Sequence, residues 1–352
     1  MNMTINRLPV PTWNHLKMNQ ADLSGITSVK EGNLTVVKPE NVAEMKASKP
    51  VYLDLATGSG RDVDKLIHDA EVPCHRYSVK KGERTAEPVR LSFRYEKDSQ
   101  DMSSVELTAE DNGYLWVIED FSGMDASGFA GIQTKIRAGR GAVVRLVQIH
   151  KLGDDLTFLN DVGGTFDESA KFELIQIVLA GGKIYLGAQA DLNGKAAELE
   201  LDSAYMVEKD HLLDINYAVN HIGRKTVSNI NANGTIADTA KKIFRGTIDL
   251  RNGAVGAKGN EMENILLMSD NIVNQTIPLI LCDEEDVEGN HGASIGKLDE
   301  ELLFYMESRG LSTEEIYRMM STAHVEALLK KVNDEMTKCD VHGFLKGAVE
   351  EE

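Results

Sequence analysis

Short β-type runs that follow one another without an intervening helix limit the fold of this chain more than any other feature of its sequence. They fill the stretch from about Tyr114 to Cys282: YLWVIE, AVVRLVQ, FELIQIVL, KIYLG, AELEL, LLDINYAV, VSNIN, FRGTIDL, ILLM and IPLILC. Turn residues separate them at intervals of roughly eight to fourteen positions, a rhythm typical of a sandwich, a barrel or a solenoid. The sequence therefore predicts a mainly β protein.

Turn chemistry alone does not choose among these three architectures. Four Asn-Gly pairs would each suit a hairpin or a solenoid corner: Asn112-Gly113, Asn193-Gly194, Asn233-Gly234 and Asn252-Gly253. The alternating Asn229, Asn231 and Asn233 would either stack in a β-helix or face solvent as separate polar positions. Both alternatives stay open, and no strict repeat unit is visible in the sequence.

The regions on either side of this β body have a different character. Residues 1–90 are expected to form a small mixed α/β region, with strands over residues 51–56 and 74–79 and a helix over residues 62–70. The charged stretch over residues 80–101 is a soft boundary, so we assign the β body to residues 91–297.

A helical domain is predicted for residues 298–352. An amphipathic helix over residues 299–308 is expected to stop at Gly310, and Ser312 with Glu315 forms a capping box for a second helix that runs to about Met336. The apolar stripe of these helices must be buried, either on the chain's own core or against a partner. The sequence leaves both alternatives open.

Composition excludes some classes of partner. The chain has 352 residues and a formal net charge of -18, which disfavours nucleic acid and anionic membranes because both would be repelled. The three cysteines form no Cys-x-x-Cys pair, and Cys282, which ends the apolar run IPLILC, is expected to be a buried structural thiol. Because we see no signal peptide and no membrane-spanning run, we expect a cytoplasmic location and no membrane insertion.

One motif favours an enzyme. The sequence LDLATGSG, Leu53 to Gly60, resembles the strand-to-glycine turn of methyltransferases that bind S-adenosylmethionine. Such enzymes also need an acidic residue after the second strand, where this chain has Lys80 and Lys81, and a doubly wound sheet that the later β runs do not provide. We keep a methyltransferase as the alternative function.

The other catalytic motifs are weak. Gly253, Gly256 and Gly259 have the rough spacing of a phosphate loop, but no helix follows them, so a strand-connecting corner is expected. Ser294 in GASIG has no strand that leads into it, as a nucleophile elbow requires. No Gly-x-x-x-x-Gly-Lys-Ser/Thr motif occurs, so ATP hydrolysis would need another subunit. We therefore predict that this chain is not an enzyme.

The segment from Cys282 to Ser312 carries a chain of motifs that resembles one family. His291 lies between an asparagine and a glycine after an acidic run, and an imidazole beside carboxylates is a competent ligand set for iron. The segment contains Asp286-Val287, NHGAS, Leu298-Asp299, Leu303-Phe304-Tyr305 and Ser308-Arg309-Gly310-Leu311. Together with NHIGRKT, FRGTIDL and ENILLMSD upstream, these motifs resemble the SufB/SufD family of iron-sulfur cluster assembly proteins.

This resemblance implies a right-handed parallel β-helix flanked by the small N-terminal α/β region and the C-terminal helical domain. It also implies that the helical tail docks a SufC-like ABC ATPase and that the β-helix pairs with a SufB-like paralogue or with a second copy of itself. A transient iron-sulfur cluster would then lie at a subunit interface, with no cofactor bound permanently.

The resemblance also assigns the candidate metal site, His291 and Glu263. His291 falls on the family's histidine at the paralogue interface, where an imidazole would ligate iron. Gly289 stands where many SufD proteins have a cysteine, and Glu263 aligns with the catalytic cysteine of SufB-type members. Because both sulfur ligands are missing, we expect a SufD-like supporting subunit in which Glu261, Glu263 and Glu288 offer only hard oxygen ligands.

Overall fold

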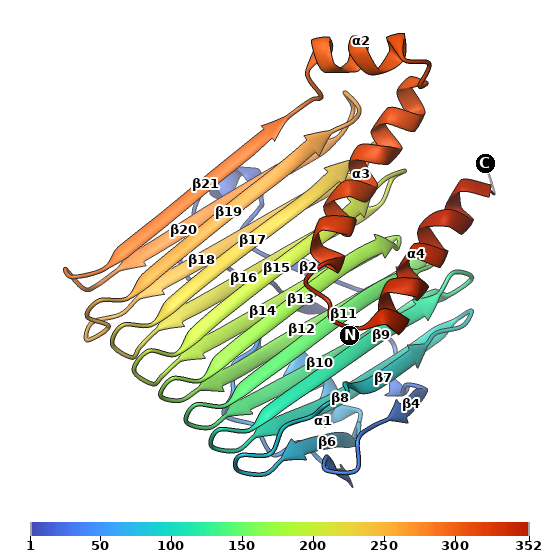
Figure 1. The fold of residues 1–352 in the computed structure, drawn as a ribbon. Coiled ribbons are helices and arrows are strands. Elements are labelled where there is room, and N and C mark those ends of the chain that lie inside the picture. The colour runs from blue at the N-terminus through green and yellow to red at the C-terminus, as the bar shows by residue number, and fades with distance from the viewer. Residues whose placement is uncertain (1, 351–352) are drawn as a thin grey trace.

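Two facing sheets form a parallel β-solenoid of about eight turns in the computed structural model, which describes residues 2–350 (Figure 1). The strands of the ten-stranded sheet are β3 (Lys30–Glu31), β5 (Ala43–Ala47), β6 (Cys74–Val79), β8 (Ser99–Ala109), β10 (Ser127–Ala138), β12 (Asp155–Phe166), β14 (Lys183–Leu192), β16 (Leu212–His221), β18 (Lys241–Leu250) and β20 (Val273–Cys282). Those of the nine-stranded sheet are β4 (Leu34–Val37), β7 (Val89–Arg94), β9 (Tyr114–Gly123), β11 (Val143–Leu152), β13 (Lys171–Ala180), β15 (Glu198–Val207), β17 (Val227–Ile236), β19 (Lys258–Leu267) and β21 (Glu288–Gly296). The prediction of a mainly β, parallel β-helix fold is confirmed.

Successive strands alternate between the two sheets, so each strand pairs with the strand two places along the chain. Leu212 of β16 pairs with Lys183 of β14 and with Lys241 of β18, so that one turn here takes 29 residues. The next turn contains more residues, because Lys241 of β18 pairs with Val273 of β20. The turn length therefore varies, which explains why no strict repeat is visible in the sequence.

The main core lies between the two sheets. Alternate residues of each strand point inward, so Phe244, Ile248 and Leu250 of β18 are buried against side chains of the facing sheet. Polar residues are common on the outer faces, although Met262 of β19 and Val273 of β20 are exposed there.

One expected turn is wrong. Asn112 and Gly253 lie at corners with positive φ angles, as predicted, but Asn233 and Gly234 lie inside β17. Gly234 is needed there because a Cβ atom on it would lie 2.1 Å from the ring of Tyr205 on the neighbouring strand. A glycine that makes room for a ring inside a strand has the same sequence signature as a glycine in a turn.

The asparagines of β17 do stack along the solenoid. Asn260 of β19 donates to Asn229 at 3.1 Å, and Asn290 of β21 donates to Asn260 at 3.0 Å. A second ladder joins Asn264 to Asn233 at 2.9 Å. Because the asparagines point to the outer face of the sheet, the ladders stabilise the stack without occupying the core.

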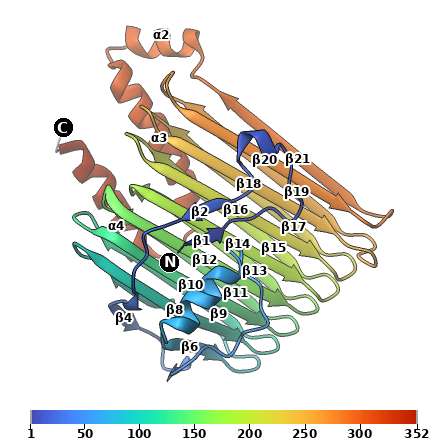
Figure 2. The same cartoon turned by 180° about the vertical axis from the view of Figure 1, so that it is seen from behind.

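The N-terminal region covers the outer face of the ten-stranded sheet (Figure 2). It comprises β1 (Met3–Ile5), β2 (Ala21–Leu23), a short 3-10 helix (Asn14–Leu16) and α1 (Arg61–Asp69). β4 and β7 pair within one sheet, and β5 and β6 within the other, so solenoid pairing begins before residue 90. The domain boundaries at residues 90 and 297 stay a prediction.

Residues 51–56 do not form the expected strand. They form a loop whose first amides, those of Val51 and Tyr52, donate to the Glu106 carboxylate at 2.6 and 2.7 Å. Gly58 touches the sheet so closely that a Cβ atom would lie 2.0 Å from the amide nitrogen of Ala188. The glycines of LDLATGSG thus allow backbone-to-sheet packing, and nothing supports a methyltransferase.

The C-terminal helices are α2 (Glu300–Ser308), α3 (Thr313–Leu329) and α4 (Glu335–Glu350). α3 and α4 lie on the outer face of the nine-stranded sheet (Figure 1). There, Val325, Leu329 and Val341 are buried against side chains such as Ile149 and Ile177. Packing on the chain's own solenoid is therefore confirmed for α3 and α4.

The expected second helix is interrupted. It begins at the predicted capping box of Ser312 and Glu315, but it ends at Leu329. Asp334 then accepts a 2.7 Å hydrogen bond from the Thr337 amide and forms an ion pair with Arg90 of β7. This contact holds the link between the helices on the sheet, which the sequence pattern did not reveal.

Candidate functional site at the open end of the solenoid

The solenoid ends at β20 and β21, which no further strand covers within residues 2–350. The inward Ile295 is therefore 43% exposed, although its partner Ile265 in β19 is buried. Cys282 is exposed as well, although its partner Leu250 is buried. The prediction of a buried thiol is wrong because no further turn of the solenoid covers Cys282 within residues 2–350.

His291 points into the solenoid at this end. In β21 it pairs with Glu261 of β19, and directly opposite residues of neighbouring strands have their side chains on the same face. Glu261 is buried at 4% exposure, so it faces inward. His291 is exposed only because nothing stacks above it. In the described part of the chain, no side chain forms a hydrogen bond or an ion pair with this imidazole.

Gly289 confirms the orientation of β21. A Cβ atom on it would lie 3.0 Å from Ile280 and 3.2 Å from Leu250, both of which are inward residues of the facing sheet. Positions 289 and 291 thus lie on one face, two residues apart. A thiol at position 289 would stand beside His291.

Glu263 is buried and fully engaged. It forms an ion pair with Lys242 of β18, and both side chains are at most 1% exposed. Its second oxygen accepts a 2.7 Å hydrogen bond from Thr276 of β20. Each carboxylate oxygen therefore has a donor, and a metal ion would have to compete with Lys242.

Glu261 is the third member of this cluster. Burial, and then the neighbouring Glu263 charge, raise its pKa to about 8, while Lys242 opposes the shift. Its carboxyl group lies over Gly246, where a Cβ atom would come within 1.9 Å of one oxygen. We call Lys242, Glu261 and Glu263 the buried charge cluster, which lies one strand below His291.

The cluster does not form a complete metal site in this chain alone. Among residues 2–350, no three His, Cys, Asp or Glu side chains converge closely enough to hold a metal ion. His291 and Glu263 also stand at different inward positions, because Glu263 pairs with Ala293. Their role as iron ligands stays a prediction.

Sequence reasoning missed Lys242, although a signal was present. In KKIFRGTIDL the inward positions are Lys242, Phe244, Gly246, Ile248 and Leu250. A lysine in phase with apolar residues indicates a buried, paired charge. Burial lowers the pKa of Lys242, and the nearby glutamates oppose this effect.

A row of inward polar residues leads from the middle of the solenoid toward the cluster. Gln148 donates to Glu119 at 2.6 Å, and Gln176 donates to Gln148 at 2.7 Å. Burial raises the pKa of Glu119 to about 7, against the hydrogen bonds from Gln148 and Thr134. The strand register continues this row to Ser203, and the apolar Ala232 then separates Ser203 from Glu263.

The fold and this site define a class of protein: a parallel β-solenoid with one open end, flanked by helices. A family model described as "SUF system FeS cluster assembly, SufBD core domain" matches residues 93–324, more than half of the chain. The chain therefore belongs to the SufBD family of iron-sulfur cluster assembly proteins, as the sequence motifs predicted.

Individual relatives agree with this family. The chain is 24% identical over 326 residues to the iron-sulfur cluster assembly protein SufD of Escherichia coli, covering 83% of this chain and 75% of that protein. It is 23% identical to SufD of Bacillus subtilis, covering 69% of this chain and 56% of that protein. A SufBD family protein of Pyrococcus horikoshii is 31% identical over 47% of this chain and 36% of its own length. The chain thus spans only part of the relatives it matches.

A separate finding concerns the helices. Within residues 2–350, none combines the length and the apolar composition needed to cross a membrane.

Proposed function

We propose that this chain is a non-catalytic scaffold subunit of a SUF-type iron-sulfur cluster assembly complex. In this proposal it binds a SufC-like ABC ATPase through its C-terminal helices and pairs through its open end with a SufB-like paralogue or a second copy. The observation that carries the proposal is the uncovered end of the solenoid, where His291 faces inward and has no bonding partner within the described chain. The cytoplasmic location expected from the sequence belongs to the same proposal.

The open end supports pairing for a physical reason. β20 and β21 present unpaired backbone N–H and C=O groups along two sheet edges, and such edges bind further strands. Glu288 is the only Asp, Glu, Lys or Arg residue in β21, so little repels an incoming strand. A partner solenoid would continue both sheets and cover Ile295 and Cys282.

His291 would then lie at the interface. An imidazole with no other bond in the described chain is free to ligate iron or a nascent cluster, which is the substrate of the assembly and not a resident cofactor. The partner would have to supply the remaining ligands. Glu263 would contribute only if Lys242 released it.

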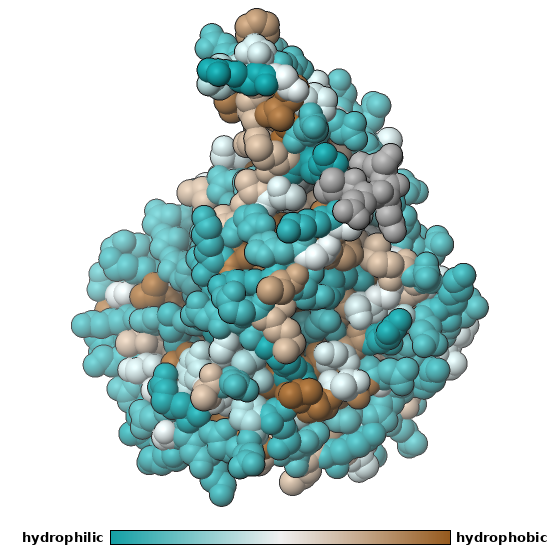
Figure 3. Space-filling view, turned by 45° about the vertical axis from the view of Figure 1, so that its right-hand side comes forward, coloured by the Kyte–Doolittle hydropathy of each residue, from teal (hydrophilic) through white to brown (hydrophobic). Residues whose placement is uncertain are grey.

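The helix α2 supports binding of an ATPase. Asp299 caps it by accepting hydrogen bonds from the amides of Glu301 and Leu302, yet none of its residues is buried. Phe304 is 72% exposed and Tyr305 is 54% exposed. Figure 3 shows hydrophobic side chains on the projection at the top of the molecule, where Figure 1 places α2. A short apolar helix without its own packing gains stability from a partner.

Replacing Phe304 tests the ATPase contact. We expect Phe304→Asp to weaken co-purification with a SufC-type ABC ATPase by roughly tenfold or more, because it buries a charge in the interface. The matched control is Met124→Asp, since Met124 is 53% exposed on the solenoid body. Failure of the unmodified chain to bind any ABC ATPase would contradict the proposal.

Replacing His291 tests its role. We expect His291→Ala to leave the fold and the pairing intact but to lower cluster assembly in the reconstituted complex. His15→Ala is the control, because His15 is also exposed and lies in the N-terminal segment. Unchanged assembly with His291→Ala would remove this histidine from the site.

A further inference from the structure

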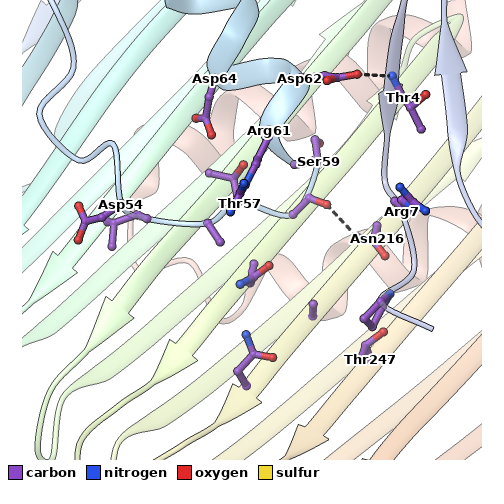
Figure 4. Close-up of a pocket in the computed structure, with 18 of the residues that line it drawn as sticks. Thr4, Arg7, Asp54, Thr57, Ser59, Arg61, Asp62, Asp64, Asn216 and Thr247 are labelled. Atoms are coloured by element: carbon purple, nitrogen blue, oxygen red, sulfur yellow. Dashed lines mark hydrogen bonds between the residues drawn. The ribbon is translucent and has the colours of Figure 1, made fainter.

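The N-terminal segment crosses the outer face of the ten-stranded sheet from strand to strand. It is fixed to α1 where the Thr4 amide donates to Asp62 at 2.8 Å, and Figure 4 shows the chain running from there past Arg7. The Asn6 side chain then donates to Asp214 of β16 at 2.7 Å. These contacts hold the start of the segment against the middle of the sheet.

The same segment reaches the last strand of the sheet two residues later. Leu8 packs on Ile277 of β20, and so does Met18 of the returning chain. The Met18 carbonyl also accepts a 2.6 Å hydrogen bond from Arg245 of β18. Figure 2 shows the short 3-10 helix of this segment beside β20. The loop over residues 9–17 therefore lies at the open end of the solenoid, and we call it the tip.

The tip is a bonded loop with a strained centre. At its base the Leu8 amide donates to the Asn19 carbonyl at 2.8 Å, and the Asn19 side chain accepts from the Thr12 amide at 2.8 Å. Trp13 has a φ angle of 49°, a left-handed conformation that is rare for a bulky residue. Such strain persists only where the surrounding structure enforces it, and it is common at binding sites.

Apolar side chains of the tip are exposed to solvent. Val10 is 47% exposed, Trp13 is 63% exposed and Leu16 is 45% exposed. The other tryptophan of the chain, Trp116, is buried beneath the C-terminal helices. Exposed apolar groups that lie close together mark a surface for another protein.

The outer face of β20 is apolar as well. Only Gln275 is polar among its outward residues, which are Val273, Gln275, Ile277, Leu279 and Leu281. The outward residues of the neighbouring β18 are mostly polar or charged. Leu8 and Met18 cover Ile277, but Val273 stays 42% exposed. One edge of the molecule thus carries both an apolar projection and an apolar strip.

We propose that the tip docks on the outer face of β20 of a second copy of this chain. This inference rests on the proposed pairing at the open end. The tip lies near Leu279 in the second half of β20, so antiparallel pairing of two β20 strands brings it to the first half of the other strand, which begins at Val273. A projection and a matching strip on one surface make that surface self-complementary, as a twofold interface requires. β20 has no charged residue, so two copies of it do not repel each other.

Tryptophan fluorescence of the full-length protein tests the contact. Trp116 is buried, so acrylamide quenches mainly Trp13, and Trp13→Phe supplies the background. We expect quenching of Trp13 to be at least about twofold weaker in the self-paired protein than in Ile295→Asp, which should stay unpaired, because the contact removes the ring from water. A self-paired protein that is quenched as strongly as Ile295→Asp would overturn the docking of the tip and leave the pairing itself intact.

Replacing Trp13 measures what the tip contributes. Trp13→Ser should raise the dissociation constant of the pair at least about tenfold, a loss typical of a tryptophan buried in an interface. The control is Met336→Ser, since Met336 is 66% exposed on α4. Analytical ultracentrifugation measures both constants, and equal values for the two variants would contradict the proposal.

A double variant tests which residue receives the tip. Within one chain Val273 lies six residues from Leu279, about 20 Å along the strand, so it does not reach its own tip. Val273→Ser should weaken the pair about threefold, and it should add little to Trp13→Ser if the two side chains meet across the interface. Fully additive losses would overturn the assignment of Val273.

The choice of a second copy has its own test. A chain that pairs only with another protein of its family would overturn this choice but not the proposed function. A chain that pairs with neither would contradict both.

Discussion

At the scale of single residues, the end of the solenoid combines a charged pair with a carboxyl group that burial keeps neutral. Lys242 and Glu263 neutralise each other in the core. Glu261 has a pKa of about 8, so it is mostly protonated at neutral pH. Two charges and one neutral acid thus fill part of the interior beside the open end.

The ion pair predicts a large effect of removing one partner. Lys242→Met would leave the Glu263 carboxylate buried without a cation, which should lower the free energy of unfolding by about 3–5 kcal/mol. Adding Glu263→Gln to this variant should restore part of the loss. Chemical denaturation measures both effects.

A matched control lies one turn along the outer surface. Lys258 and Glu288 form an exposed ion pair, with side chains 52% and 61% exposed. Lys258→Met should therefore change the free energy of unfolding by less than about 1 kcal/mol. Equal losses in Lys242→Met and Lys258→Met would show that the buried pair has no special role.

The raised pKa of Glu261 predicts a dependence of stability on pH. The folded protein binds this proton more tightly than the unfolded chain, whose carboxyl group has its ordinary pKa near 4.5. The stabilisation is therefore complete below about pH 4.5 and is lost as the pH rises through about 8. Glu261→Gln should remove a decline on the order of a few kcal/mol from the denaturation profile.

Other buried acids titrate in the same direction. Burial raises the pKa of Asp161 to about 6 and that of Glu119 to about 7. Glu261→Gln should therefore flatten the profile only in part, and mainly at its alkaline side. Parallel profiles of wild type and variant between about pH 5 and about pH 8 would contradict the assignment.

The sequence could propose His291 and Glu263 as candidate ligands, which stays a prediction, but it could not show what surrounds them. Resemblance to the family's motifs identifies single positions in the sequence. Which side chains meet across the solenoid depends instead on the strand register. Lys242 and Glu263 are separated by a corner and lie on different sheets, so no local pattern joins them. Cys282 was misjudged for the same reason, since its exposure depends on which turn is the last.

At the scale of elements, glycines inside strands allow close packing between neighbouring turns of the solenoid. Gly234→Ala should lower the free energy of unfolding by about 1–3 kcal/mol, because the new methyl group would overlap the Tyr205 ring. Gly296→Ala is the control, since a Cβ atom there meets nothing within 4 Å. Thermal or chemical denaturation would show the difference, and equal stability of the two variants would contradict it.

Elements with strong local signals were predictable, whereas those fixed by contacts were not. The strand at residues 74–79, the stop at Gly310 and the capping box of α3 occur as the sequence indicated. The loop over residues 51–56 has the composition of a strand, but its amides bond to Glu106 instead of to a sheet neighbour. The break before α4 depends on Arg90, which is distant in the sequence.

At the scale of the whole molecule, the two ends of the solenoid differ. The N-terminal end finishes on two short strands, β4 and β5, which pair antiparallel with β7 and β6. The other end stops at β20 and β21 with exposed edges. A long parallel edge at one end and short antiparallel edge strands at the other predict a defined pair of subunits, since short edge strands resist the further pairing that would continue a fibre.

A substitution at the open end tests this asymmetry. Ile295→Asp should abolish pairing, because it would place a charge on an inward position of the terminal strand, 43% exposed in the single chain. Met124→Asp, at a corner of the stack, should leave pairing unchanged. Light scattering with size-exclusion chromatography measures the assembly, and persistent pairing of Ile295→Asp would place the interface elsewhere.

Native mass spectrometry of the chain co-expressed with a SufC-type ABC ATPase and a SufB-like paralogue tests the central claim most directly. The proposed scaffold role predicts an assembly in which this chain is bound to the ATPase and paired either with the paralogue or with a second copy. A chain that stays monomeric and free of the ATPase, with α2 and β21 intact, would contradict it.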